Sequence, residues 1–309
     1  DFQRQKLLPN KSSQLGPGMA WGDVDGDEDD DVFIGGSAGF IGKLFFNQGN
    51  GQFKNALQFC FTYDVRSEDM GSLFIDFDRD GDLDLYVVSG GVECKPGDVL
   101  LRDRLYINDG TGNFQKGSLD LLPDIRSSGS VVTAADIDGD GYLELFIGGR
   151  IIPGKYPESP RSYVLRNTGS KYEDATDVFA PEIKQAGMVT SALFTDVDGD
   201  HQSDLLVTYE WGPVRYFHNE RGQLIDRTSH AGLTNRQGWY NSISGGDMDN
   251  DGDMDYLVGN FGLNTKYQAS KKNPEIMYYG DFEGNGKKRI IEAKYEDGIC
   301  FPHRGLGCS

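Results

Sequence analysis

The chain has 309 residues, with 49 acidic and 30 basic side chains and a formal net charge of −19 at pH 7. Such an acidic chain lacks the basic face that nucleic acid or anionic lipid would require, which argues against both as partners. No apolar run approaches the roughly 18–20 residues of a membrane span and no signal peptide precedes Asp1, so we expect no membrane insertion and treat the chain as a mature or excised segment.

Residues 1–18 precede the first repeated unit, and residues 19–309 are predicted to form one repeat domain. The sequence Asn10-Lys11-Ser12 is a glycosylation sequon, which matters only if the protein is secreted.

An acidic nine-residue pattern, D-x-D-x-D-G-x-x-D, occurs five times, and a sixth, altered copy follows. We number these segments as loops in chain order. They are DVDGDEDDD (loop 1, 23–31), DFDRDGDLD (loop 2, 76–84), DIDGDGYLE (loop 3, 136–144), DVDGDHQSD (loop 4, 196–204), DMDNDGDMD (loop 5, 247–255) and DFEGNGKKR (loop 6, 281–289).

Three or four carboxylates within a few ångströms repel one another, and a divalent cation removes that cost. Ca²⁺ takes about 6–8 hard oxygen ligands, whereas Mg²⁺ needs a near-ideal octahedron and is the poorer candidate. The pattern predicts side-chain ligands at positions 1, 3, 5 and 9 and a backbone carbonyl at position 7. The predicted ligands are Asp23, Asp25, Asp27, Asp29 and Asp31; Asp76, Asp78, Asp80, Asp82 and Asp84; Asp136, Asp138, Asp140, Tyr142 and Glu144; Asp196, Asp198, Asp200, Gln202 and Asp204; and Asp247, Asp249, Asp251, Asp253 and Asp255.

The segments after the loops distinguish this pattern from the helix–loop–helix calcium site, which has a bidentate Glu at position 12 and a following helix. Here β-branched, strand-like segments follow, ending in glycine in most units: VFIGG, LYVVSG, LFIGG, LLVTY and YLVGN. Another strand precedes each loop, and a hairpin such as RLYINDGTGNFQKG comes after, with Gly and Asn expected at positive φ. Four short antiparallel strands per unit predict an all-β fold, a β-propeller of about 5–7 blades whose last blade is incomplete.

These units resemble the FG-GAP/VCBS repeats of secreted calcium-binding propellers, which share their loop pattern with the integrin α-subunit head. The resemblance covers nearly the whole chain, notably GMAWGDVDGD, FIDFDRDGDLDLYVVSGG, DRLYINDGTGNF and GDMDNDGDMDYLVGNFGLNTKY. It implies one Ca²⁺ for each intact loop, about five in all.

Several loops depart from the pattern. Glu28 and His201 stand where glycine is expected, so we predict that these two turns are strained or bind the ion more weakly. Loop 6 offers Asp281, Glu283 and Asn285, but Arg289 occupies position 9, so a sixth ion there is doubtful.

The four cysteines form an even set without a C-x-x-C, which makes a zinc ribbon improbable. Cytosolic Ca²⁺ would leave such loops mostly empty, so we expect an oxidising location, either secreted or at the cell surface. Of the three possible pairings we prefer Cys60–Cys94 with Cys300–Cys308, and the alternative is four free thiols.

The fifth unit lacks its hairpin, so a propeller needs another way to close. Either residues 1–18 supply the missing strand or an open edge recruits strands from another copy. We therefore expect a non-enzymatic structural, adhesive or assembly module that forms homo-oligomers or filaments, and we predict no catalytic residue. The alternatives are a glycan-binding protein, a calcium-dependent polysaccharide lyase, or an integrin-like head that needs a partner chain.

Overall fold

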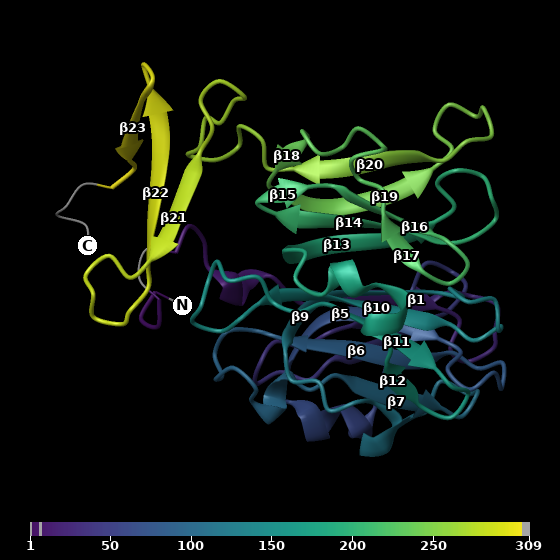
Figure 1. Cartoon of the computed structure of the whole chain (residues 1–309). Coiled ribbons are helices and arrows are strands. Elements are labelled where there is room, and N and C mark those ends of the chain that lie inside the picture. Colours follow the sequence, from purple (N-terminus) through teal and green to yellow (C-terminus); the bar gives the residue numbers. More distant parts are fainter. Residues whose placement is uncertain (1, 6–7, 305–309) are drawn as a thin grey trace.

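The computed structural model describes residues 2–5 and 8–304, which form an all-β propeller of antiparallel sheets stacked face to face (Figure 1). Each sheet that contains one of loops 1–5 is called a blade, and blades 1–4 have four strands each. Blade 1 contains β1 (Met19–Gly22), β2 (Asp31–Ile34), β3 (Lys43–Asn47) and β4 (Phe53–Ala56); blade 2 contains β5 (Glu68–Ile75), β6 (Asp84–Gly90), β7 (Arg104–Asn108) and β8 (Phe114–Lys116). Blade 3 contains β9 (Ser128–Ala135), β10 (Glu144–Ile151), β11 (Tyr163–Asn167) and β12 (Tyr172–Asp174); blade 4 contains β13 (Met188–Thr195), β14 (Asp204–Glu210), β16 (Arg215–Asn219) and β17 (Leu224–Asp226).

The later units are smaller, as the lost hairpin sequence predicts. Blade 5 is the pair β19 (Tyr240–Gly246) and β20 (Asp255–Asn260), and β15 (Gly212–Pro213) pairs separately with β18 (Gln237–Gly238). A last sheet, drawn in yellow in Figure 1, contains β21 (Ile276–Gly280), β22 (Arg289–Glu296) and β23 (Ile299–Pro302). The helices are α1 (Thr176–Phe179) and 3₁₀ turns at Ser12–Gln14, Phe59–Asp64, Val99–Leu101, Leu119–Leu121 and Pro181–Ile183.

The core consists of layers between successive blades. Along β10, Leu145 packs with Tyr86 of blade 2, whereas its neighbour Phe146 packs with Phe217 of blade 4. Strands β6, β10 and β14 are buried along their whole length because each is covered on both faces. This double burial explains why their sequences are continuously apolar rather than alternating.

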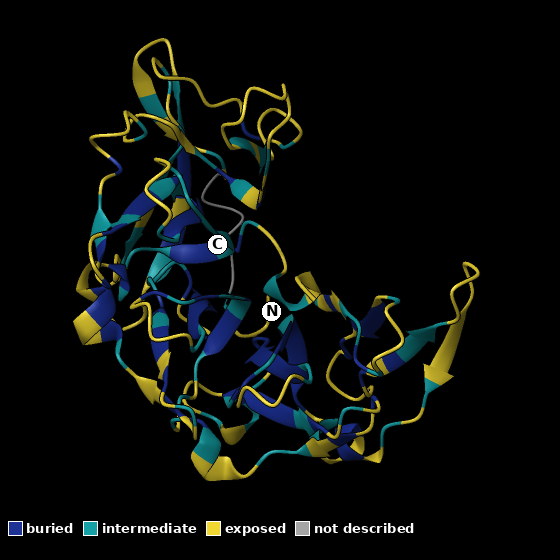
Figure 2. Cartoon of the chain, turned by 90° about the vertical axis from the view of Figure 1, so that its right-hand side faces the viewer, coloured by how far each residue is buried: buried dark blue, intermediate teal, exposed yellow. Residues whose placement is uncertain are grey.

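The blades follow one another around an arc (Figure 2). The first strand of each blade packs against the first strand of the next, in the order β1, β5, β9, β13 and β19. Strand β20 at one end of the arc has no fully buried residue, in contrast to β14 of the neighbouring blade. The side chains of β20 are therefore less buried than those of β14, because a neighbouring blade covers only one face of the β19–β20 sheet.

The described part of residues 1–18 contains one 3₁₀ turn and no strand, so it does not close a blade within this chain. Instead, Leu8 is buried with Val92, Met188 and Ile290, which belong to three different sheets or their flanking loops. Donation of a strand to a second copy remains a proposal.

Asparagine residues at the ends of the third strands connect each blade to the one before it. Their side-chain Nδ2 groups donate across the blade interface to the backbone carbonyl of the second residue in the preceding loop. The three bonds are Asn108 to Val24 at 2.8 Å, Asn167 to Phe77 at 2.8 Å and Asn219 to Ile137 at 3.0 Å. We call these residues the latch asparagines.

The positive φ angles expected at asparagine in these hairpins lie at glycines instead, for example Gly110 at 77° and Gly169 at 75°. That part of the prediction is wrong, because a latch asparagine is the last residue of a strand and stays extended. Its amide group is used for hydrogen bonding rather than for turning the chain.

Replacing one latch asparagine tests the contribution of the interblade bond. Asn167→Ala leaves the buried Phe77 carbonyl without its donor, so we expect it to lower the free energy of unfolding by about 1–3 kcal/mol in urea titrations. The matched control is Asn47→Ala in blade 1, because Asn47 Nδ2 donates only within its own blade, to Asp30. Equal losses for the two variants would contradict an interblade role.

Candidate metal centres

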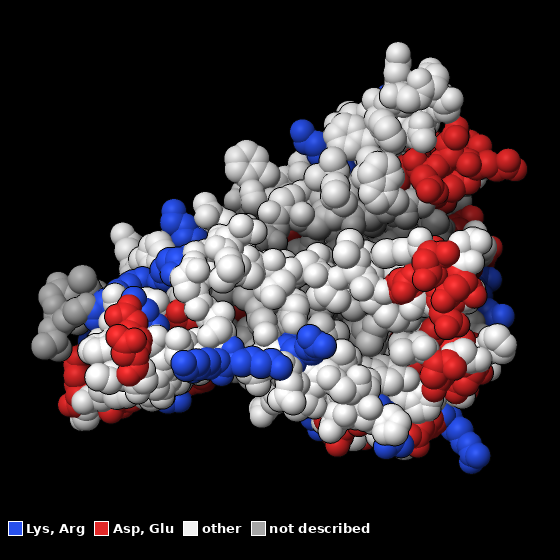
Figure 3. Space-filling model, turned by 90° about the horizontal axis from the view of Figure 1, so that it is seen from above, with Lys and Arg blue, Asp and Glu red and all other residues white. Residues whose placement is uncertain are grey.

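Each acidic loop joins the first two strands of its sheet, and loop 6 joins β21 to β22. Loops 1–5 therefore lie at the same end of successive blades. Figure 3 shows Asp and Glu side chains gathered along that end of the molecule. The stacking of blades thus brings together acidic groups from distant parts of the sequence.

One backbone frame recurs in all six loops. The N–H of position 6 donates to the position 1 carboxylate over 2.7–3.2 Å. The N–H of position 7 donates to the position 5 side chain over 2.9–3.0 Å. Even loop 6, with Asn285 at position 5, keeps this turn, so the fold of the loop does not depend on the full set of acids.

The strained turns predicted in loops 1 and 4 are confirmed, since Glu28 has φ 72° and His201 has φ 66°. The sequence did not reveal that position 4 is also left-handed. There Arg79 has φ 64° and Asn250 has φ 63°, whereas loops 1, 3, 4 and 6 have glycine. Each loop thus contains two left-handed residues, and in loops 1 and 2 the carboxylates of positions 1, 3 and 5 converge.

The position 9 carboxylates are buried in loops 1–4: Asp31 and Glu144 are 0% exposed, Asp84 is 2% and Asp204 is 0%. Each accepts the N–H of its own loop's position 2, at 2.9–3.2 Å. In loops 1, 2 and 4 the other carboxylate oxygen accepts the backbone N–H of the asparagine that ends the third strand. In loops 1, 2 and 4 the position 9 carboxylate therefore links the backbone of its loop to the third strand of the blade.

Loops 1–4 each bring three acidic groups within 4.8 Å of one another. The groups are Asp23, Asp25 and Asp27; Asp76, Asp78 and Asp80; Asp136, Asp138 and Glu144; and Asp196, Asp198 and Asp204. Among the described residues, Asp25 Oδ1, Asp76 Oδ1 and Glu144 Oε1 are buried oxygens that accept no hydrogen bond. A buried carboxylate oxygen without a donor needs a counterion, so the donor set of loops 1–3 fits a hard divalent cation.

The electrostatics of the loops agree with this fit. Burial, and after it the charges of Asp78 and Asp80, raise the pKa of Asp84 to about 7. Burial, together with Asp138 and Asp140, likewise raises the pKa of Glu144 to about 7. Without a cation these carboxylates hold protons near neutral pH, and a bound divalent ion would reverse that preference.

Side chains from the third strand lie over some loops, which sequence reasoning missed. In blade 3, Arg166 Nη2 lies 2.9 Å from Asp138 Oδ2 and 3.1 Å from Asp140 Oδ2. In the last sheet the neighbouring cation comes from the loop itself: Arg289, at position 9 of loop 6, places its Nη2 3.6 Å from Oε2 of Glu283, a candidate ligand.

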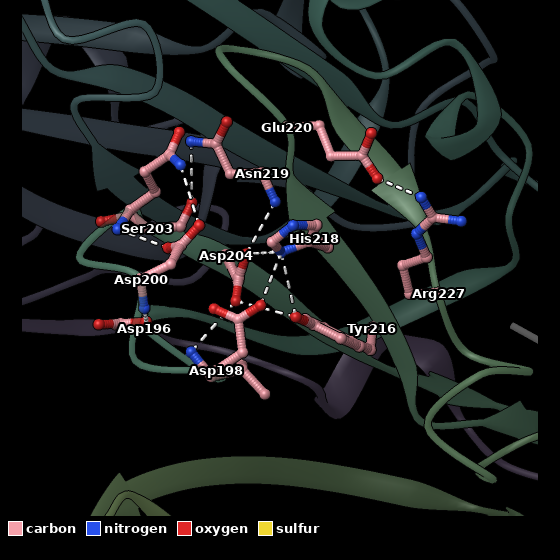
Figure 4. A network of polar contacts seen from close by, with 12 residues as sticks. Asp196, Asp198, Asp200, Ser203, Asp204, Tyr216, His218, Asn219, Glu220 and Arg227 are labelled. Atoms are coloured by element: carbon pink, nitrogen blue, oxygen red, sulfur yellow. Dashed lines mark hydrogen bonds and ion pairs between the residues drawn. The ribbon is translucent and has the colours of Figure 1, made fainter.

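In blade 4 the corresponding side chain is His218, whose ring lies beside the loop 4 carboxylates (Figure 4). His218 Nδ1 is 3.0 Å from Asp204 Oδ1, and the Tyr216 hydroxyl donates to Asp204 Oδ2 at 3.0 Å. Loop 4 thus has polar neighbours that its nine residues alone do not show.

The predicted Cys60–Cys94 disulfide is wrong, because both residues are free thiols. Cys60 is buried with Phe61 in the core between blades 1 and 2, where burial raises its thiol pKa to about 11. Cys300 has no disulfide to a described residue, and Cys308 lies outside the described residues. Asn10 of the sequon is exposed.

No helix among the described residues is long and apolar enough to cross a membrane.

None of the curated proteins compared with the chain matches it. Among solved structures, the chain is similar to an Agrocybe aegerita lectin that recognises non-reducing terminal N-acetylglucosamine, with 17% identity, 93% of this chain and 80% of the lectin covered, and a TM-score of 0.49.

It is also similar to the V. cholerae biofilm matrix protein Bap1, with 16% identity over 90% of this chain and 37% of Bap1 and a TM-score of 0.33. For a thermostable family-43 glycoside hydrolase the identity is 9%, the coverage 96% of both chains and the TM-score 0.43. These similarities are too low to assign a ligand or an activity to this chain.

The match to a sequence family is more extensive. The model of the FG-GAP-like repeat matches residues 23–87, 96–147 and 196–258. These segments contain loops 1–5 and at least part of the strand that follows each of them. On this basis the chain belongs to the family of FG-GAP-like repeat proteins.

Proposed function

We propose that this chain is an extracellular, calcium-stabilised β-propeller that serves as a structural, adhesive or assembly module and has no catalytic role. The observation that carries the proposal is the set of buried carboxylate oxygens without donors in three successive loops, Asp25 Oδ1, Asp76 Oδ1 and Glu144 Oε1. Millimolar extracellular calcium suits loops of this kind, which bind at about 10⁻⁴–10⁻³ M in extracellular modules.

In this function the protein supplies the ligands and the ion supplies positive charge. The carboxylates of positions 1, 3, 5 and 9 would hold the ion together with the carbonyl of position 7. The latch asparagines bond to the carbonyl of position 2 in the preceding loop, for example Asn167 to Phe77. An ion that restricts the motion of one loop would therefore also restrict the next blade, whose latch asparagine is bonded to that loop.

Self-association is part of the proposal, and the exposed surface at the ends of the arc supports it. On β1 and β2, Met19, Trp21 and Ile34 are 58%, 56% and 37% exposed, and on β20, Leu257 is 64% exposed. In the inner blades the corresponding faces are covered by a neighbour. Contact between opposite ends of two copies would be heterologous and would continue the stack, which produces rings or filaments.

Carbohydrate recognition and lyase chemistry remain alternatives predicted from the sequence. Their marker is a basic or tyrosyl group beside a bound ion. Arg166 and Tyr216 lie beside loops 3 and 4, but both are already engaged with loop carboxylates. We therefore do not place a substrate there.

Removing calcium should destabilise the fold. At a hundredfold excess over Kd each ion contributes about 2.7 kcal/mol to the native state, so EGTA should lower the Tm by several degrees or more in calorimetry. Asp76→Asn should remove one calcium per chain in isothermal titration. The matched control is Asp281→Asn, at the same position of loop 6, which should leave the number of bound ions unchanged. An unchanged melting curve in EGTA would refute the proposal.

The pH dependence should reverse with calcium. In chelator, Asp84 and Glu144 have pKa values of about 7 in the folded state, against roughly 4 in the unfolded chain. The native state then binds more protons between pH 4 and 7, so the free energy of unfolding falls as pH rises through this window. With saturating calcium, protons compete with the ion and stability should instead rise. Urea titrations at pH 5.5 and 7.5 measure both trends, and a parallel dependence in the two conditions would contradict them.

Particle size tests self-association. Trp21→Arg places a charge on the exposed face of β1 and should shift sedimentation towards the monomer. Leu119→Arg is the matched control, because Leu119 is 62% exposed but lies on the 3₁₀ turn Leu119–Leu121, away from the ends of the arc. Identical sedimentation of wild type and Trp21→Arg would count against assembly through this face.

A further inference from the structure

One position of the third strand contacts the acidic loop in blades 3 and 4 and has an equivalent in blades 1 and 2. It directly precedes the asparagine that ends the strand, and its occupants are Phe46, Ile107, Arg166 and His218. The ion pairs of Arg166 with Asp138 and Asp140 show that a side chain at this position reaches the carboxylates. The residue found there therefore determines which chemical group meets the ion.

In blade 4 this position brings an imidazole nitrogen into the carboxylate cluster. His218 Nδ1 lies 3.0 Å from Asp204 Oδ1 and 3.5 Å from Asp198 Oδ2. Nδ1 and one carboxylate oxygen each from Asp198 and Asp200 all lie within 4.8 Å of one another. Figure 4 shows the ring of His218 turned towards the loop from β16, so the loop and a separate strand both contribute to the cluster.

The separations are those of two ligands that share one divalent ion, and the nitrogen indicates which class of ion. Nitrogen and oxygen ligands lie about 2.0–2.2 Å from Zn²⁺, so two of them in one coordination sphere stand roughly 3.0–3.5 Å apart. Calcium takes oxygen ligands almost exclusively, whereas imidazole suits zinc and its neighbours in the first transition row. We propose that loop 4 is a mixed imidazole–carboxylate site for a zinc-class divalent ion, held by His218 Nδ1 and the carboxylates of Asp198, Asp200 and Asp204.

A second difference between the blades supports the assignment. Two residues before His218, Tyr216 donates its hydroxyl to Asp204 Oδ2, and the corresponding residues in blades 1–3 are Leu44, Leu105 and Val164. Asp204 also accepts the backbone N–H groups of Val197 and Asn219. These three donors fix the orientation of the Asp204 carboxylate and leave a lone pair of Oδ1 directed towards His218. Carboxylate ligands of zinc are commonly oriented by hydrogen bonds in the same way.

This inference rests on the proposal that the loops bind metal ions, but its test separates the two. Wild-type protein freed of metal is titrated with Zn²⁺ by calorimetry in 2 mM calcium. We expect one Zn²⁺ per chain that excess calcium does not displace. Both His218→Ile, which places the blade 2 residue type here, and His218→Asn, which keeps a hydrogen-bonding group, should weaken Zn²⁺ binding at least tenfold. Tyr216→Phe should weaken it about tenfold.

The matched control is His201→Gly, which removes an imidazole whose side chain is 95% exposed and restores the usual glycine of position 6. It should keep Zn²⁺ affinity, and the His218 variants should keep calcium binding at the other loops, which shows that they are folded. Co²⁺ offers an independent readout, since its visible absorption reports nitrogen ligation and should change in the His218 variants.

The zinc assignment is overturned if calcium displaces Zn²⁺ from wild type or if both His218 variants bind Zn²⁺ as tightly as wild type. Calcium in all five intact loops with no retained Zn²⁺ would overturn it while leaving the proposed function in place. Retained Zn²⁺ in loop 4 without calcium binding elsewhere would support it and refute the calcium-stabilised propeller.

Discussion

Repulsion between carboxylates is the constraint on which this structure depends. Each of loops 1–4 holds at least three of them within 4.8 Å of one another. The backbone N–H groups of positions 6 and 7 offset part of the repulsion by donating to positions 1 and 5, as Gly141 and Tyr142 do to Asp136 and Asp140. Oxygens such as Glu144 Oε1 stay without a donor, so the backbone alone does not balance the charge. A cation is the simplest group that does.

The position of the loops makes this local balance important for the whole fold. Two of the latch asparagines, Asn108 and Asn219, donate their backbone N–H to the position 9 carboxylate of their own loop and their side-chain amide to the preceding loop, as Asn219 does to Asp204 and to Ile137. Apolar layers such as that of Phe146 and Phe217 pack the same blades together, and the latches add directional bonds between them at the loop end. Because these bonds end on the acidic loops, electrostatic balance and blade packing are coupled.

The repeat, the strand order and the positions of the acidic loops were predictable because each is encoded within about ten neighbouring residues. The loop turn needs only its own nine residues, and the strands after it are buried on both faces, which leaves a continuous apolar run as in β10. The loss of the hairpin in the fifth unit was also visible in the sequence.

What the sequence hid depends on contacts between distant residues. Asn167 is 90 positions from the carbonyl that it binds, and nothing near it in the sequence indicates that partner. The Cys60–Cys94 prediction failed for a similar reason, since spacing does not show that Cys60 is buried in an interblade core. The left-handed Arg79 and Asn250 were missed because only glycine signals that conformation clearly.

The loops share one backbone frame but differ in the side chains above them. Phe46 and Ile107 add no charge, Arg166 brings a cation to loop 3, and His218 brings an imidazole nitrogen to loop 4. The shared backbone hydrogen bonds therefore fix the positions of the loop carboxylates, whereas the side chain from the third strand changes the charge and the ligand type beside them. Because Arg166 already neutralises part of the charge on Asp138 and Asp140, an ion entering loop 3 must displace it or share those carboxylates. If the loops hold calcium as proposed, loop 3 fills at a higher concentration than loop 2, and the blades become rigid in steps rather than together.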